Sequence, residues 1–318
     1  NVYGGDAAGI SALTVGGGDA SASYSGVIQN ASSTLALTKI GLGTQTLVGA
    51  STYSGGTTVN GGVLALGGAN DGLSRVGSGP LTINAGGTVL SVAFNVLGYD
   101  SSTVTPVVVI NGGTWNAQGN DASFRTLTMN GGSLLRTGGF WFFNQAGAIT
   151  VTGGAAVIAG GQMRLRPAGG VAMPITVSAG ATLSVSATLA NDAGVAGFAK
   201  AGPGTLVLSA TNTYAGNTWV SNGVLALSGG GSISNSPILA LDTNGVLDVS
   251  ATAFSLGRGQ TLQGYGAVTG GFAAADGAKL QPGAAGVAGT LTFNGSVTFG
   301  AGTTNLFDLT SGTNVGAG

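Results

Sequence analysis

The sequence predicts an all-β protein built as a parallel β-helix, a solenoid of roughly 13–14 stacked coils. Three observations predict this fold: a composition suited to strands and turns, a long internal repeat, and a shorter repeat of about twenty residues along the chain. We expect residues 1–318 to form one continuous solenoid, with shorter coils over residues 257–318.

The composition is that of short strands joined by tight turns. Of 318 residues 63 are Gly, 43% are hydrophobic and only 6% carry a charge. Disordered chains combine few apolar residues with a high net charge, whereas the net charge here is −1. All the acidic residues are Asp, which favours turns, and none is Glu, which favours helices. The glycines are therefore expected at turns, where a positive φ costs them little.

The long repeat consists of residues 39–68 and 200–229, which align without a gap and are identical at about half of their positions. Lys39 corresponds to Lys200, and both copies contain a Thr-Tyr-x-Gly segment followed by a Val-Leu-Ala-Leu strand. Internal repeats of this kind indicate a fold in which similar units stack on one another.

The shorter repeat is a small polar-Gly turn followed by alternating apolar residues. Asn60-Gly61-Gly62 precedes Val-Leu-Ala-Leu, and Asn111-Gly112-Gly113 precedes Thr-Trp-Asn-Ala. One such unit cannot bury its apolar face, but stacked coils can. A β-barrel or β-sandwich made of hairpins is the alternative, since Asn-Gly turns favour hairpins. The coil-sized repeat and the 6% content of aromatic residues favour the solenoid.

Alternation along the strands predicts which side chains lie inside. Leu and Val should fill the interior, Thr and Ser should cover the outside, and Asn ladders should form at the turns. The residues expected inside are Leu64, Leu66, Leu183, Val185, Leu206, Leu208, Leu225, Leu227 and Leu247.

Residues 43–68 and 204–229 resemble the autotransporter-associated β-strand repeat, and residues 261–302 are similar to the segment that often follows such repeats. The resemblance implies a right-handed parallel β-helix, secretion, and a passenger or stalk role in a Gram-negative-type surface protein. It implies no reaction. The sequence begins without Met or a signal peptide and lacks the translocator barrel of a whole autotransporter, so we expect a mature or excised part of a longer protein.

The sequence predicts no catalytic residue, no cofactor and no metal site. It has no His and no Cys, which excludes imidazole and thiolate sites. The closest two carboxylates in sequence, Asp242 and Asp248, are interpreted as turn and cap residues. The small net charge predicts no nucleic-acid partner, and no apolar run approaches the roughly 18 residues of a membrane helix.

Residues 124–166 are unusually rich in basic and aromatic residues. A surface that binds a glycan or a partner could combine Arg side chains with exposed aromatic faces. The candidates for such a surface are Arg125, Arg136, Trp141, Arg164 and Arg166.

The interpretation that we favour for this region is an aromatic core plug, with Arg side chains lying over it or pairing with Asp121. Alternation places Arg164 and Arg166 on one face of a strand and Met163 and Leu165 on the other. The remaining cations are expected on the solvated surface: Lys39, Arg75, Lys200, Arg258 and Lys279.

The leading functional hypothesis is a non-enzymatic structural component of the bacterial cell surface or of an extracellular filament. Its partners would be copies of itself or neighbouring segments of the same protein, because neither end offers a polar cap and few charges oppose stacking. The alternative is an adhesin that binds glycans. A polysaccharide-degrading enzyme is least favoured, because it would need carboxylates converging on one groove.

Overall fold

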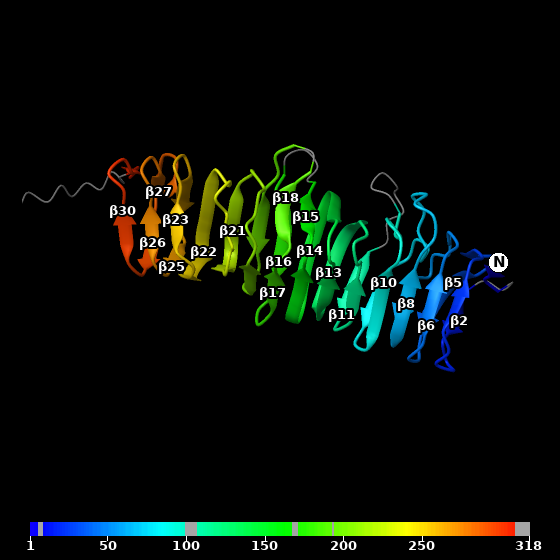
Figure 1. Cartoon of the computed structure of the whole chain (residues 1–318). Coiled ribbons are helices and arrows are strands. Elements are labelled where there is room, and N and C mark those ends of the chain that lie inside the picture. The colour runs from blue at the N-terminus through cyan, green and yellow to red at the C-terminus, as the bar shows by residue number, and fades with distance from the viewer. Residues whose placement is uncertain (6–8, 99–106, 167–170, 193, 309–318) are drawn as a thin grey trace, which may run out of the picture.

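The structure, a computed structural model, describes residues 1–5, 9–98, 107–166, 171–192 and 194–308. These residues form an all-β solenoid of about 12 turns with parallel strands and no helix. Figure 1 shows an elongated rod in which the chain advances coil by coil from the N-terminal end to the opposite end. The predicted fold class is therefore confirmed.

Two stacks of strands run along the rod, and one strand of each stack belongs to each coil. The first stack holds β2 (Ile10–Val15), β5 (Thr34–Lys39), β7 (Thr57–Val59), β9 (Leu81–Asn84), β11 (Val108–Asn111), β16 (Met173–Val177), β19 (Phe198–Ala201), β24 (Thr261–Gly264), β27 (Lys279–Ala284) and β31 (Thr304–Asn305). The second holds β3 (Ala22–Tyr24), β6 (Thr44–Leu47), β8 (Gly62–Leu66), β10 (Gly87–Ser91), β12 (Thr114–Asn116), β17 (Thr182–Val185), β20 (Thr205–Leu208), β25 (Ala267–Thr269) and β29 (Thr292–Asn294).

Four long strands bend from one stack into the other: β13 (Ala122–Leu135), β14 (Phe140–Ala159), β21 (Thr218–Ser228) and β22 (Ile238–Ala251). A third side of the rod carries β15 (Gln162–Leu165) and β18 (Thr188–Asn191). There the first residues of β13 pair with those of β14, which pair with β15, and β15 pairs with β18. A separate sheet is formed by β23 (Phe254–Leu256), β26 (Phe272–Ala274) and β30 (Val297–Phe299). The remaining strands are β1 (Val2–Tyr3), which pairs with β4 (Ile28–Gln29), and β28 (Val287–Ala288), which is antiparallel to β27.

The interior follows the predicted alternation. All nine predicted interior residues are at most 1% exposed, and the long strands alternate buried and partly exposed positions. The parallel register explains why, since it places Leu183, Leu206 and Leu225 one above the other in successive coils. A one-residue slip would turn the whole apolar set toward solvent.

The predicted Asn ladder forms at the turns that follow the first stack. The Asn84 side-chain amide donates to the side-chain oxygen of Asn60 at 2.7 Å, and that of Asn111 donates to Asn84 at 3.2 Å. These partners are 24 and 27 residues apart. Coil length varies along the rod, because other register partners of the same stack, such as Ile110 and Met129, are closer together in the sequence.

The glycines after the ladder are required by the stacking. Gly62 has a φ of 59°, and a Cβ on it would lie 2.5 Å from the Gly41 carbonyl oxygen in the preceding coil. Gly223 is equivalent, with a φ of 73° and a Cβ position 2.5 Å from two backbone oxygens. Only glycine combines this backbone conformation with this close approach.

Candidate binding surfaces

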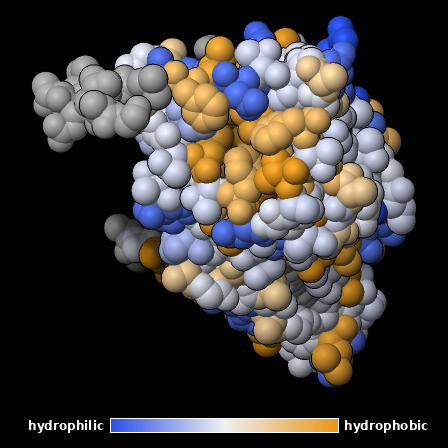
Figure 2. Space-filling model, turned by 90° about the vertical axis from the view of Figure 1, so that its left-hand side faces the viewer, coloured by the Kyte–Doolittle hydropathy of each residue, from blue (hydrophilic) through white to orange (hydrophobic). Residues whose placement is uncertain are grey.

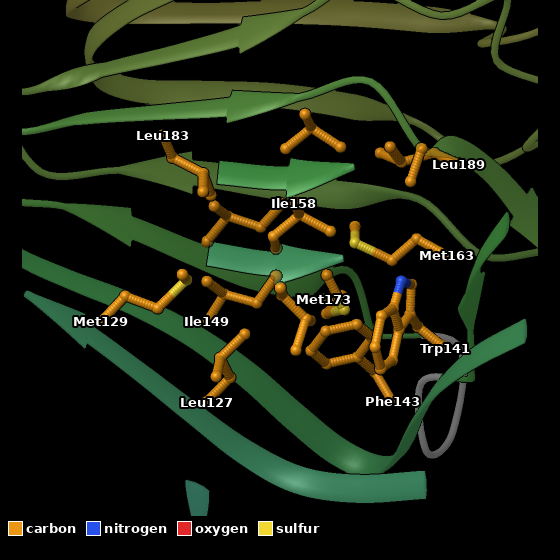
Figure 3. Packing of buried hydrophobic residues seen from close by; sticks show 14 of the residues in the cluster. Leu127, Met129, Trp141, Phe143, Ile149, Ile158, Met163, Met173, Leu183 and Leu189 are labelled. Carbon is orange, nitrogen blue, oxygen red and sulfur yellow. The ribbon is translucent and has the colours of Figure 1, made fainter. Parts of the chain in front are cut away.

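Four aromatic residues in or just before the 124–166 region form a plug inside the rod. Trp115, Phe124, Trp141 and Phe143 are at most 1% exposed. The Trp141 ring centroid lies 5.8 Å from that of Trp115 and 6.0 Å from that of Phe124. Figure 3 shows Trp141 and Phe143 pointing inward together with Met163 and Met173. Trp141, predicted as a candidate for an exposed binding surface, is therefore a core residue, because β14 places it on the inward side of the strand.

Arg136 lies over this plug. Its guanidinium carbon is 4.2 Å from the centre of the Trp141 ring, and Nη2 lies 3.9 Å from the Asp121 carboxylate and donates to the Asn120 carbonyl. Burial lowers the pKa of Arg136 to about 10, partly opposed by the charge of Asp121, so the side chain stays charged at neutral pH. Arg136 is 6% exposed, so it too is removed from the predicted surface.

Arg164 and Arg166 form the outer part of the same region. As predicted, they lie opposite the buried Met163 and Leu165. The Arg164 guanidinium carbon is 4.5 Å from the centre of the Phe140 ring, and the Arg166 guanidinium carbon is 4.3 Å from that of Phe142.

Acceptors from the next coil hold both arginines in place. Arg164 Nη1 donates to the Asn191 carbonyl at 2.5 Å, and Arg166 Nε pairs with the Asp192 carboxylate. Arg125 is exposed on β13. Of the five predicted surface residues, Arg125, Arg164 and Arg166 therefore remain outside the core.

Two lysines predicted on the surface are fully buried, which corrects that prediction. Lys39 and Lys200 are 0% exposed, and each ammonium donates to three backbone carbonyls. For Lys200 the acceptors are Ala201 at 3.0 Å, Gly202 at 2.7 Å and Asn222 at 3.0 Å. The third acceptor belongs to the next coil, so the lysine joins two successive turns.

Arg75 is also buried, contrary to the prediction of a solvated side chain. It is 2% exposed and lies inside its own loop. Its guanidinium donates to the carbonyls of Gly67 at 2.7 Å and Leu73 at 3.1 Å, to the Ala69 carbonyl, and to the Asp71 carboxylate at 2.9 Å. In contrast, Arg258 and Lys279 are exposed, as predicted.

The carboxylates of the described residues do not gather into a site. Asp248 accepts a hydrogen bond from the Ser250 backbone amide at 2.9 Å, as a cap residue does, while Asp242 and Asp248 both belong to the long strand β22. No group of three potential metal-ligating side chains occurs in the part of the chain that the structure describes. The same part contains no helix that could span a membrane.

Sequence reasoning missed an exposed tryptophan on β21. Trp219 is 49% exposed and lies in a groove of about 420 Å³ together with Val171, Val195 and Pro237. The repeat alignment contains a signal for it, because Trp219 corresponds to Thr58 in the first copy.

Two segments of the chain match the model of the passenger-associated transport repeat, residues 37–66 and 198–227. They overlap the two predicted repeat copies, residues 39–68 and 200–229, with a shift of two residues. Among solved structures, the crystal structure of a TibC-catalysed hyper-glycosylated TibA fragment is similar, with 17% sequence identity over 94% of this chain and 100% of that chain and a TM-score of 0.28. A likeness at this level has no bearing on function. A comparison with curated proteins finds no significant match.

The fold defines the class of the protein, a parallel β-solenoid built from stacked repeats. Within this class the chain carries two passenger-associated transport repeats, as the resemblance to autotransporter passengers predicted.

Proposed function

We propose that this chain is a non-enzymatic passenger segment that forms a rigid rod at the outer surface of a bacterial cell. The observation that carries the proposal is a single solenoid interior that passes without interruption through both passenger-associated transport repeats. Such a rod supplies length and stiffness through stacking alone, because each coil contacts only its neighbours. The scattered carboxylates support a role without catalysis.

The location can be tested on intact cells that produce the protein. An antibody raised against the chain should label unbroken cells, and external protease should remove the labelling while a cytoplasmic marker survives. Labelling that appears only after the cells are broken would contradict the proposal.

We propose further that rods associate end to end. Partly exposed hydrophobic residues pack against the core at both ends of the rod. They are Leu13, Val15 and Tyr24 in the first coil, and Phe293 and Val297 in the last described coil. Figure 2 views the rod from the end that carries β30, and hydrophobic residues gather on that face. Exposed strand edges next to apolar surface are templates for pairing.

Sedimentation at increasing protein concentration tests end-to-end association. We expect the isolated parent chain to form larger species as its concentration rises. The variant Phe299→Asp, which changes a residue that is 51% exposed on β30, should remain monomeric. Lys279→Asp, at an exposed side position, is the control for added negative charge and should leave the association unchanged. Monomers at all concentrations would refute the proposal.

A second candidate function is ligand binding at the outer face formed by Arg125, Arg164 and Arg166. The specific observation that favours it is the ordered pair of guanidinium groups stacked on Phe140 and Phe142. Binding of acidic oligosaccharides that is lost in Arg164→Gln and Arg166→Gln, with unchanged thermal stability, would support it. Equal binding by these variants would exclude it.

A further inference from the structure

Trp219 differs from the other two tryptophans in being at the surface. Trp115 and Trp141 are 0% exposed, whereas Trp219 is 49% exposed. Val171 and Val195 in the same groove are 68% and 67% exposed. The groove volume of about 420 Å³ falls within the range of small-molecule sites.

The fold does not need a tryptophan at this position. In the first repeat copy the equivalent residue is Thr58, which pairs in register with Thr38 and Thr82 of the adjacent coils. An outward threonine is thus sufficient for the same strand in the same kind of coil. The large aromatic residue in the second copy therefore has a role other than stacking the coils.

The neighbouring coils leave the indole accessible. Trp219 pairs in register with Ala199 on β19 and Ala240 on β22, so that small side chains lie on either side of it. Thr38 of the first copy corresponds to Ala199 of the second. The second copy thus has Ala199 where the first has Thr38, next to Trp219 where the first has Thr58. The smaller alanine leaves more of the indole ring accessible.

The chemistry of the groove selects an uncharged ligand. Its described lining contains Ala, Gly, Val, Pro, Trp and Asn but no charged side chain. The nearby Lys200 is fully buried, with its ammonium donating to backbone carbonyls. An anionic ligand would find no counter-charge in this lining, whereas the exposed Asn217 supplies an amide that can donate to and accept from hydroxyl groups.

We propose that the groove at Trp219 binds a neutral pyranose unit of a glycan. A pyranose ring has an apolar face of C–H groups that can cover the indole and a rim of hydroxyl groups that can bond to Asn217. This arrangement of one aromatic surface, a mostly apolar groove and a few placed polar groups is that of a small-ligand site. The site lies on the side of the rod, so it does not depend on the passenger role proposed above.

The distribution of tryptophans makes the proposal directly measurable. Because Trp115 and Trp141 are buried, acrylamide should quench only the fluorescence of Trp219. We would screen an array of neutral and acidic oligosaccharides and then titrate the best neutral binder into the full chain. Binding should protect Trp219 from acrylamide in the parent chain, and calorimetric titration should show that Trp219→Thr binds the same glycan at least about tenfold more weakly.

Trp219→Thr is a matched variant, since Thr58 occupies the same position in the first copy, and its melting temperature should equal that of the parent. Tyr265→Ala, which removes another exposed aromatic residue, should leave binding intact. The proposal is overturned if no neutral glycan on the array binds, if only acidic glycans bind, or if Trp219→Thr binds as well as the parent. It is also overturned if Trp219 becomes protected by self-association in the absence of glycan.

Discussion

At the scale of single residues, the main departure from expectation is the burial of two lysines. Each copy of the repeat directs its lysine ammonium at the carbonyls of a Gly turn, as in the contacts of Lys39 with Ile40, Gly41 and Gly61. The sequence alone suggests a solvated cation, since lysine is rarely buried. The sequence signal that agrees with this structural role is the recurrence of the lysine at the same place in both copies.

Replacing Lys200 with Met should destabilise the solenoid by about 2–4 kcal/mol at pH 7, because three backbone carbonyls would lose the ammonium that donates to them. Urea denaturation followed by circular dichroism measures this. The matched control is Lys279→Met, whose lysine is exposed and whose loss should change the free energy of unfolding by less than about 0.5 kcal/mol. Equal effects in the two variants would refute the assignment.

Stability should also depend on pH through Lys200. Burial lowers its pKa in the folded protein to about 8, below the value of about 10.4 in an unfolded chain. Between these values the unfolded state holds more protons, so the free energy of unfolding should rise as the pH increases from 8 toward 10. Burial lowers the pKa of Lys39 as well, which adds in the same direction.

The pH prediction is checked by comparing the parent chain with Lys200→Met at pH 7 and pH 9.5. The gain in unfolding free energy over this interval should be smaller in the variant. An identical gain in both proteins would show that Lys200 does not titrate in this range.

At the scale of elements, the Asn-Gly turns determine how closely the backbones of successive coils stack. The sequence pattern predicted the turn and the ladder of Asn60, Asn84 and Asn111. It did not predict how close the backbones approach, because that distance depends on the residues of the preceding coil. At Gly223 the approach leaves no room for a side chain.

Gly223→Ala should therefore cost about 2–4 kcal/mol, from the strain of a left-handed alanine and from the collision of its Cβ with two carbonyl oxygens. The control is Gly138→Ala, where a Cβ would meet no atom within 4 Å. We expect Gly138→Ala to be neutral or slightly stabilising. Thermal unfolding of both variants would settle the comparison, and a tolerated Gly223→Ala would contradict the stacking geometry.

In the aromatic segment Phe140–Phe143, the alternation of side chains does not by itself predict which residues are buried. Alternation along Phe140-Trp141-Phe142-Phe143 correctly implies that two rings face inward and two outward, but it does not say which two. The structure places Trp141 and Phe143 inside, and the pairing of β14 with β15 then aligns Trp141 with Met163. Which of these rings point inward is decided by the register between coils, and the sequence of a single strand does not reveal that register.

At the scale of the whole molecule, the interior and the repeats were predictable because both follow from local period and stacking. The groove at Trp219 was not, since it joins residues from separate coils, such as Val171 and Pro237. Surface sites of this kind depend on how the loops of successive coils lie together. The comparison of repeat copies is the part of the sequence that contains information about them.

Removing one whole coil should leave a folded rod. Deletion of residues 59–82 joins Thr58 to Ile83, and because Thr58 and Thr82 are register partners, every remaining strand keeps its inward face. We expect a soluble, protease-resistant protein with cooperative unfolding, about 4.8 Å shorter than the parent. Deletion of residues 59–70 removes only part of a coil and should give a protease-sensitive product. Similar behaviour of the two deletions would count against a solenoid held by register.

The loop around Arg75 has a practical consequence. All four acceptors of its guanidinium lie within residues 67–73, so the loop organises itself around its own cation. Because these guanidinium contacts are all internal, the loop can be transferred to another coil of the rod for protein engineering. A foreign epitope can also be inserted at its tip without removing the contacts of Arg75.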